Sequence, residues 1–254
     1  MGEFTGKKVL ITGGGKGIGK GIALEFARRG AKVAIGCNAN PGMAQDTLKE
    51  LSAMTEAVLI PSDVGTPEGC KHLVDEAVRA FGGLDVLVNN AAIQTQYSFL
   101  EADSAVLKQV MNVNLRAAML MLKYAHPYLK DAGAGRAILI SSVHGKRPTD
   151  FDAAYAISKG GMEMLCREAA IAFAGDGITV NIVAPGAVMI ESKTGNPKPM
   201  TILRVKREKY FSKHPMGRIT VPEDVAQIVC FLSESGASQI SGTTIRIDGC
   251  SMLL

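Results

Sequence analysis

The chain has 254 residues, of which 47% are hydrophobic and 20% charged, and its formal net charge at pH 7 is only +4. This balance is typical of a globular protein with a large core, and no apolar run approaches the ~18 residues that a membrane span requires. Residues 1–8 lack the layout of a secretory signal peptide, and the five cysteines and four histidines show no disulfide or metal-ligand spacing, so we expect a cytoplasmic protein with reduced thiols and no metal.

Short apolar segments alternate with helical segments along almost the whole chain. Strands are predicted over 8–12, 32–36, 57–61, 85–88, 136–141, 178–184 and 243–247. Helices are predicted over 17–30, 43–54, 67–81, 104–129 with Ser104 as its cap, 153–174, and from a capping box at 220–223 to about 233. Apolar strands separated by helices predict an α/β fold with a seven-stranded parallel sheet buried on both faces. No linker composition occurs, so we expect one domain over 1–254.

The first strand runs into a glycine-rich turn, Thr12-Gly-Gly-Gly-Lys-Gly-Ile-Gly19, which opens the first helix. Glycines there allow a tight turn and the close approach of a pyrophosphate, and the helix amino terminus offers free N–H groups to phosphates. The turn therefore predicts a Rossmann-type doubly wound sheet that binds a dinucleotide. The residues expected to bind it are Gly13, Gly15, Lys16, Gly17, Ile18 and Gly19. The alternative is a flexible loop in a chain that contains 28 glycines.

The end of the second strand carries no acidic residue, because Cys37 and Asn38 occupy it. An acid at this position usually binds the ribose hydroxyls of NAD, whereas a nearby cation accommodates the 2′-phosphate of NADP. Lys16 stands immediately before Gly17, so the sequence favours NADP(H) over NAD(H). The alternative is that Lys16 is a solvated loop residue.

Tyr155 and Lys159 lie four residues apart in a predicted helix, so their side chains share one face. A phenol titrates near pH 10, and a nearby ammonium group lowers its pKa. The pair predicts an acid/base unit that moves a proton on or off oxygen. Ser142 precedes Tyr155 by thirteen residues and adds a hydroxyl to the same candidate site.

Several separate motifs together resemble the short-chain dehydrogenase/reductase family over nearly the whole chain. They are the glycine turn, Asp63-Val64, Asn89-Asn90-Ala91-Ala92, Asn114, Ser142, Tyr155 with Lys159, and Pro185-Gly186. The resemblance implies an oxidoreductase that interconverts a carbonyl and a secondary alcohol. It also implies a homotetramer built through the helix of Tyr155 and the last strand.

The same resemblance implies roles for individual residues. Tyr155 would be the general acid/base, Lys159 would hold the nicotinamide ribose, Ser142 would bind the substrate oxygen, and Asn114 would hold a relay water. Cofactor contacts would also come from Asp63, Val64, Asn90, Ala91, Ala92, Pro185, Gly186 and Val188. Simpler alternatives are a structural amide at Asn114, a turn residue at Asp63, and Ser141 in place of Ser142.

Three positions depart from the family pattern. Ala92 replaces the glycine of Asn-Asn-Ala-Gly, and Cys250 replaces the second glycine of Asp-Gly-Gly. Ile190 stands where a threonine usually binds the nicotinamide carboxamide, so backbone groups near Val188, or the side chains of Ser192 or Thr194, would have to substitute.

A lid is expected at about 187–215, because a long irregular segment inside a compact domain is usually functional. Residues 193–218 carry eight basic side chains and one acidic side chain, without the interleaved aromatics that grip nucleic acid. The charge suggests an anionic substrate, such as a carboxylate, phosphate or CoA thioester, and the alternatives are a solvated helix or an oligomer contact.

The substrate is left open by the sequence. A local likeness to glucose 1-dehydrogenases lies in Ser141-Ser-Val-His144 and Ser158-Lys-Gly-Gly161. A 3-oxoacyl thioester reductase is an alternative, weakened by Gly133 and Asp176 where carrier-protein reductases place arginines. A non-catalytic NADP(H) sensor is the alternative of another class.

Overall fold

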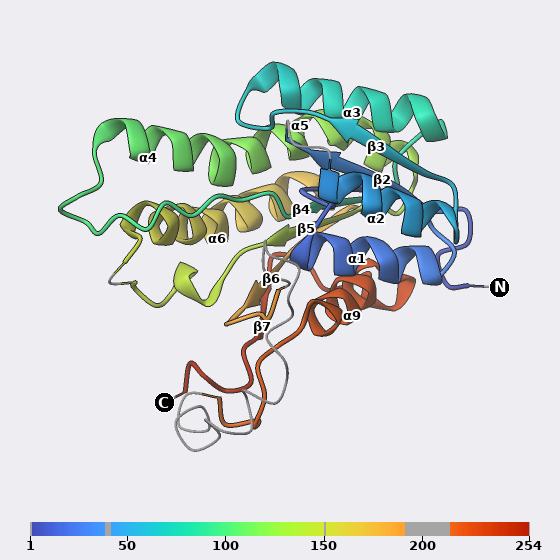
Figure 1. Cartoon of the computed structure of the whole chain (residues 1–254). Coiled ribbons are helices and arrows are strands. Elements are labelled where there is room, and N and C mark those ends of the chain that lie inside the picture. Colours follow the sequence, from blue (N-terminus) through green and yellow to red (C-terminus); the bar gives the residue numbers. More distant parts are fainter. Residues whose placement is uncertain (1, 39–41, 150, 191–213, 254) are drawn as a thin grey trace.

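Seven parallel strands form one sheet in the computed structural model, which describes residues 2–38, 42–149, 151–190 and 214–253 (Figure 1). The strand order is β3-β2-β1-β4-β5-β6-β7. The strands are β1 (Lys8–Thr12), β2 (Lys32–Cys37), β3 (Ala57–Pro61), β4 (Val86–Asn89), β5 (Arg136–Ile140), β6 (Thr179–Pro185) and β7 (Thr244–Ile247). This architecture confirms the predicted α/β fold class.

Helices cover both faces of the sheet, because its strands are apolar on both sides. One face packs against α1 (Gly17–Arg28), α2 (Gly42–Ser52) and α9 (Pro222–Ser233). The other packs against α3 (Pro67–Phe81), α5 (Ala117–Asp131) and α6 (Ala153–Ala174). The remaining elements are α4 (Ser104–Met111), the turns η1 (Asn112–Arg116) and η2 (Val143–Gly145), and η3 (Ser235–Ala237).

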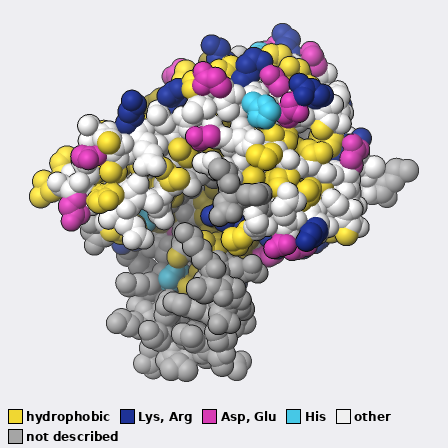
Figure 2. Space-filling view, turned by 45° about the horizontal axis from the view of Figure 1, so that its top comes forward, with side chains coloured by type: hydrophobic (Ala, Val, Ile, Leu, Met, Phe, Trp, Pro, Cys, Tyr) yellow, Lys and Arg dark blue, Asp and Glu magenta, His cyan; other side chains and the backbone are white. Residues whose placement is uncertain are grey.

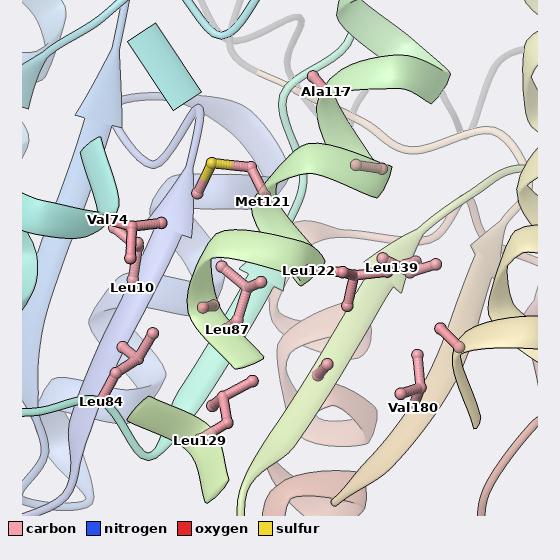
Figure 3. Close-up of a cluster of buried hydrophobic side chains, with 14 of the residues drawn as sticks. Leu10, Val74, Leu84, Leu87, Ala117, Met121, Leu122, Leu129, Leu139 and Val180 are labelled. Carbon is pink, nitrogen blue, oxygen red and sulfur yellow. The ribbon is translucent and has the colours of Figure 1, made fainter. Parts of the chain in front are cut away.

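The core on the α3, α5 and α6 face is built from leucines that come from successive strands (Figure 3). Leu10, Leu87 and Leu139 are fully buried there, and they come from β1, β4 and β5. Met121 and Leu129 of α5 pack on them from above the sheet. The cluster spans β1 and β4, which pair directly in the sheet, and the ends of these strands carry residues of the candidate site.

The helix predicted over 104–129 is interrupted, so that prediction was partly wrong. Residues 112–116 form the π-helical turn η1 between α4 and α5. The apolar spacing continues across the turn, so the sequence pattern does not reveal it. Ser104 is the first helical residue and not the cap, because the carboxylate of Asp103 accepts a hydrogen bond from the Val106 N–H at 2.8 Å.

The capping box predicted at Thr220 lies one residue further along the chain. Val221 is the N-cap of α9, and its N–H donates to the Asp224 carboxylate at 2.9 Å. Valine has no side-chain acceptor, so only the reciprocal half of a capping box forms. The hydroxyl of Thr220 instead contacts the carbonyl of Ile247 at 3.4 Å.

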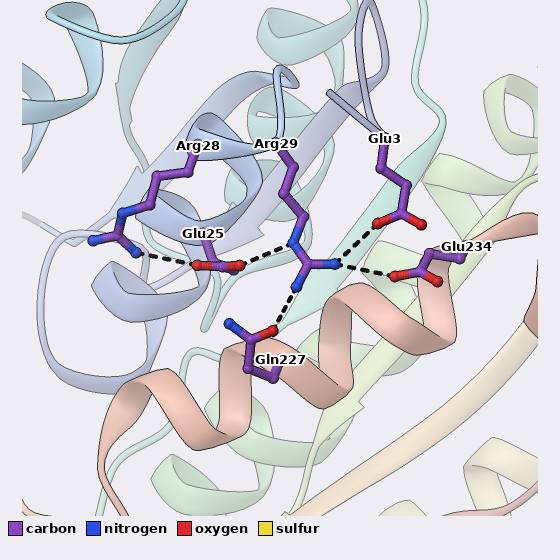
Figure 4. A network of polar contacts seen from close by, with 6 residues as sticks. All are labelled: Glu3, Glu25, Arg28, Arg29, Gln227 and Glu234. Atoms are coloured by element: carbon purple, nitrogen blue, oxygen red, sulfur yellow. Dashed lines mark hydrogen bonds and ion pairs between the residues drawn. The ribbon is translucent and has the colours of Figure 1, made fainter. Parts of the chain in front are cut away.

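A network of ion pairs and hydrogen bonds lies at the amino edge of the sheet (Figure 4). Arg29 follows α1 and binds Glu25, Glu3 and Glu234 at 2.9–3.1 Å and Gln227 at 2.5 Å. The guanidinium thus joins the start of the chain, α1 and the end of α9. Burial raises the pKa of Glu25. The bonds from Arg29, Gln227 and Arg28 together outweigh burial, so the pKa of Glu25 lies below its ordinary value.

None of the helices in the described residues is long and apolar enough to cross a bilayer. Across the same residues, no group of three or more His, Cys, Asp or Glu side chains is placed to hold a metal ion. All five cysteines are free, and Cys70, Cys166 and Cys230 are buried.

Candidate active site

The predicted site residues gather at the carboxyl edge of the sheet. The strand order reverses between β1 and β4, and in open α/β sheets ligands bind outside the strand ends at such a switch point. Thr12 ends β1 and Asn89 ends β4 at this point. Ile140 and Pro185 end the next two strands on the same edge.

Asn90 fixes the glycine turn to the end of β4. Its Nδ2 donates to the carbonyls of Thr12 and Gly13, both at 3.0 Å. In return, the Thr12 hydroxyl accepts from the N–H groups of Asn90 and Ala91 at 2.9 Å. A Cβ at Gly19 would lie 2.2 Å from the Gly13 carbonyl oxygen, so the close crossing of turn and helix requires glycine there.

The start of α1 has the donor set of a phosphate site. Lys16 is its extended N-cap residue, and no side chain caps the helix, so the first-turn N–H groups of Gly17, Ile18 and Gly19 are left for a ligand. Gly17 has φ +53°, a conformation that favours glycine. A dinucleotide pyrophosphate fits these residues.

The glycine turn also lies against the end of β2, where the adenosine ribose is expected. Gly14 donates to the Gly36 carbonyl at 3.2 Å, and a Cβ at Gly15 would lie 2.6 Å from that of Ala44. Cys37 ends β2, and burial raises the pKa of its thiol, which keeps it uncharged. Asn38 and Lys16 are exposed, and neither side chain carries a carboxylate.

Asp63 follows β3 and uses one carboxylate oxygen in a turn, where Oδ1 accepts from the Gly65 N–H at 2.9 Å. Val64 beside it is half-buried. This bond supports the alternative in which Asp63 is a turn residue.

Lys159 is fully enclosed at the carboxyl end of β5. Its Nζ donates to the Ile140 carbonyl at 2.8 Å and lies 5.5 Å from the centre of the Tyr155 ring. Burial lowers the pKa of Lys159 to about 7, because a low-dielectric site disfavours the ammonium. The structure thus places the lysine beside the phenol ring, as the helical spacing predicted.

The pKa of Tyr155 is raised in this structure, which reverses the direction expected from the Tyr–Lys spacing. Burial is the largest cause, the charge of Asp152 adds to it, and the Ser142 hydroxyl acts in the opposite direction. The expected lowering requires a charged Lys159, and burial removes much of that charge near pH 7. A dinucleotide ribose bound to Lys159 would add polar partners to the Ile140 carbonyl and so favour the charged ammonium.

The two neighbouring serines have different surroundings. Ser141 donates to the Lys159 carbonyl at 3.2 Å and so faces the backbone of α6. Ser142 accepts from the His144 N–H at 3.2 Å, and its hydroxyl interacts with the phenol of Tyr155. The arrangement therefore favours Ser142 over Ser141 as the partner of Tyr155.

The side-chain amide of Asn114 is occupied. Its Oδ1 accepts from the Ile93 N–H at 2.9 Å, and its Nδ2 donates to the Ile93 carbonyl and to Ser158 at 3.0 and 3.1 Å. Both amide hydrogens are therefore used, as in the structural alternative for this residue. Asn114 lies within η1, and π-helical turns occur frequently at functional sites.

Beyond β6, the chain turns back toward the glycine turn. The N–H of Gly186 donates to Ile247 at 3.0 Å, and Val188 pairs with Thr220. A Cβ at Gly17 would lie 3.3 Å from a methyl group of Ile190, so the isoleucine lies next to the start of α1. Ser192, Thr194 and most of the predicted lid fall outside the described residues.

Ala92 follows Ala91 without strain. Gln96 and Cys250 are the non-glycine residues with positive φ in the described part of the chain, so Ala92 needs no left-handed backbone. Glycine at this position is therefore not required by the local conformation.

Sequence reasoning missed two residues of this region. Thr12 links β1 to β4 through its hydroxyl. Asp152, three residues before Tyr155, caps α6 by accepting from the Tyr155 N–H at 3.0 Å. An aspartate directly before a predicted helix was a visible signal for a cap.

The chain matches the family model described as enoyl-(acyl carrier protein) reductase over residues 13–250. It is 34% identical to glucose 1-dehydrogenase 2 of Bacillus subtilis (strain 168) over 97% of this chain and 95% of that protein. It is 33% identical to L-rhamnose 1-dehydrogenase (NAD(P)(+)) of Sphingomonas sp. (strain SKA58), with 96% and 95% covered. Hydroxynaphthalene reductase arp2 of Aspergillus fumigatus (strain ATCC MYA-4609 / CBS 101355 / FGSC A1100 / Af293) is 34% identical, with 94% and 90% covered.

Among solved structures, a protein assigned as a short-chain alcohol dehydrogenase from Sinorhizobium meliloti 1021 has the same fold. The TM-score is 0.88 at 27% identity, with 99% of this chain and 98% of that chain covered. The seven-stranded sheet, the glycine turn at its switch point and these near full-length matches agree. The chain therefore belongs to the short-chain dehydrogenase/reductase family and is an oxidoreductase that acts on CH–OH groups.

Proposed function

We propose that the protein interconverts a carbonyl and a secondary alcohol with NADP(H), using Tyr155, Lys159, Ser142 and Asn114. The observation that carries the proposal is the grouping of the first three beside the glycine turn at one sheet edge. The nicotinamide supplies or accepts the hydride when it is bound. The chain's own residues then have to align the substrate and move one proton.

In the direction of reduction, Ser142 donates a hydrogen bond to the substrate carbonyl oxygen and stabilises the charge that develops there. Tyr155 transfers its phenol proton to that oxygen, which completes the alcohol. Lys159 has a pKa of about 7, so it can return a proton toward the phenolate at neutral pH. Asn114 acts through Ile93 and Ser158, whose positions it fixes.

The NADP(H) preference is supported by the missing carboxylate at Cys37 and Asn38 and by the exposed Lys16. We expect Lys16→Ala to weaken NADPH binding by about tenfold and to leave NADH binding nearly unchanged, because a phosphate contact is charge-assisted. Cys37→Asp should favour NADH instead. Fluorescence titration measures both affinities, and equal effects of Lys16→Ala on the two cofactors would contradict the preference.

A sugar or polyol substrate is supported by the relatives named glucose and rhamnose dehydrogenases. The basic segment 193–218 supports an anionic group on the substrate, and most of it lies outside the described residues. On the face shown in Figure 2, basic and acidic side chains of the described residues are interspersed. A charge reversal at Arg204, Lys206 and Arg207 tests this, with kcat/KM measured at two salt concentrations.

A 3-oxoacyl thioester reductase is a second candidate; the description of the matching family model shares with it an acyl-carrier-protein substrate, but names an enoyl reductase. Asp176 opposes it, because this carboxylate stands where an arginine would grip the carrier and is bound by Lys130 and His126 at 2.8 Å. These two bonds lower the pKa of Asp176, which keeps it anionic.

The decisive experiment is turnover of NADPH or NADP⁺ with a panel of sugars, ketones and 3-oxoacyl thioesters, repeated with Tyr155→Phe. Loss of the phenol proton should lower kcat/KM by about 10²–10⁴. Tight NADPH binding without turnover of any substrate would favour the sensor alternative.

We further propose a cytoplasmic homotetramer with a lid at 187–215 as part of one domain. The free cysteines support a reducing compartment. Exposed apolar residues on α6 support an assembly through that helix: Ile157, Met164 and Ile171.

A further inference from the structure

The segment between β4 and α4 is irregular, yet it is fastened along α6. Ile93 is held through Asn114, which also binds Ser158 of α6. Two residues further, Thr95 binds Asp152 at the start of the same helix. In Figure 1 this connection runs between α4 and α6. Because the two attachments on α6 lie on either side of Tyr155 along the helix, the segment passes beside the catalytic tyrosine.

Asp152 makes the second attachment with a fully buried carboxylate. Its Oδ2 accepts from the N–H groups of Thr95 and Gln96 at 2.7 and 3.1 Å. Its Oδ1 accepts from the Tyr155 N–H at 3.0 Å and contacts the Thr95 hydroxyl at 3.3 Å. It makes no ion pair with any residue that the structure describes.

A helix cap requires only one hydrogen bond to the first turn, and it does not require a carboxylate that is fully buried without an ion pair. Removing such a charge from water costs several kcal/mol unless hydrogen bonds satisfy its oxygens. Asp103 caps α4 with an exposed carboxylate and one bond to Val106, so the same chain shows the simpler solution. The additional bonds of Asp152 all go to the segment of Thr95 and Gln96.

The backbone of Gln96 is strained where it meets Asp152. Its φ is +61°, a left-handed conformation that costs a side-chain-bearing residue about 1–2 kcal/mol. The N–H groups of Thr95 and Gln96 both donate to one oxygen of Asp152, an arrangement that resembles a backbone anion nest. Strain of this kind persists only where surrounding bonds hold it, and it concentrates at ligand sites.

We propose that Asp152 is a positioning residue that fastens Thr95 and Gln96 to the helix of Tyr155 and so fixes the substrate-facing wall of the active site. The inference rests on the proposed function. Gln94, Gln96 and Tyr97 are exposed on this wall and offer amide and hydroxyl groups to a hydroxyl-rich substrate. Ala153 adds a bond from its N–H to the Tyr97 carbonyl at 3.3 Å.

Asp152→Ser separates the two roles of the carboxylate. Serine is a good N-cap and keeps the bond to Tyr155, but it is too short to reach Gln96 as well. We expect the amides of Thr95 and Gln96 to exchange with deuterium about tenfold faster, since charge-assisted bonds are lost. The substrate KM should rise about tenfold while the NADPH Kd changes far less, and the pH profile of kcat should move to lower pH because the Asp152 charge no longer raises the pKa of Tyr155.

Asp103→Ser is the matched control, because it makes the same change at an exposed cap with no loop attached. It should alter neither the exchange at 95–96 nor the substrate KM. Should Asp152→Ser fail to fold, Asp152→Asn replaces it; one oxygen remains, and an intermediate increase in exchange is expected.

Wild-type exchange at Thr95 and Gln96 in Asp152→Ser would overturn the fastening. Faster exchange with an unchanged KM would overturn the role in substrate binding. Failure of the proposed function appears differently, as absence of turnover in the wild-type enzyme. In that case the exchange rates still decide whether Asp152 fastens the segment.

Discussion

Cys250 adopts a left-handed backbone with φ +69°, directly after Gly249 with φ +55°. Cys250 stands at the second glycine of the Asp-Gly-Gly pattern described above, and it lies in the turn that follows β7. The turn is held by bonds from Ser251 and Met252 to Asp248 at 3.0 and 2.9 Å. The side chain at 250 therefore stores strain that the neighbouring bonds maintain.

Cys250→Gly should raise the free energy of unfolding by about 1 kcal/mol, because a left-handed side chain costs more than glycine loses in entropy. Urea denaturation measures it. Cys250→Ser keeps the Cβ and removes the thiol, so it should give no gain. Equal stabilisation by both variants would assign the effect to the thiol.

Lys159 should make stability depend on pH. Its pKa is about 7 in the folded protein against 10.5 ordinarily, so between these values the unfolded chain binds one more proton. The free energy of unfolding should therefore rise with pH in this window, by up to about 1.4 kcal/mol per unit. Lys159→Met removes this contribution. Denaturation curves at pH 7.5 and 9.5 compare the two proteins, and parallel changes would contradict the buried lysine.

At the residue scale, the sequence indicated which side chains lie in the candidate site better than it indicated their hydrogen-bond partners. Tyr155, Lys159 and Ser142 lie close together because their spacing places them on one helix face and at one strand end. The partners of Asn114 and Asp152 were not predictable, because they come from the irregular segment after β4, whose path no periodic pattern describes. The raised pKa of Tyr155 depends on burial, which spacing does not report.

At the scale of elements, the strands and most helices followed from apolar spacing, since both faces of the sheet are buried. The π-helical turn η1 did not, because one inserted residue leaves the apolar pattern on both sides intact. The turn matters because Asn114 lies in it and holds Ile93.

Arg29 adds polar bonds to the apolar contact between α1 and α9. Arg29→Gln should lower the free energy of unfolding by about 1–3 kcal/mol, because it removes several charge-assisted bonds. Arg28→Gln is the control, since Arg28 is half exposed and binds Glu25 alone; its effect should stay below about 0.5 kcal/mol. Similar losses in both variants would show that the network adds nothing beyond single surface pairs.

At the scale of the whole molecule, α6 carries an unpartnered apolar stripe. Ile157, Met164 and Ile171 are 51%, 54% and 77% exposed and follow one another at seven-residue spacing on one side of the helix. Such a stripe favours pairing between copies of the chain, in agreement with the proposed tetramer.

The variant Met164→Glu with Ile171→Glu should yield a smaller species, because two buried charges oppose association. Sedimentation velocity measures the size. Met43→Glu provides the control, since Met43 is 45% exposed on α2, away from the stripe. An unchanged size of the double variant would remove α6 from the interface.

The position of the amino-terminal residues bears on how the protein can be attached to a support. Glu3 is bound to Arg29 at the edge opposite the glycine turn, and the amino terminus lies beside the ends of α1 and α9 (Figure 1). The residues after β7 instead lie against Gly186, where a Cβ would be 3.1 Å from that of Asp248. Immobilisation through the amino terminus therefore leaves the glycine turn facing solution, whereas a carboxyl-terminal tag would follow the residues that lie against Gly186.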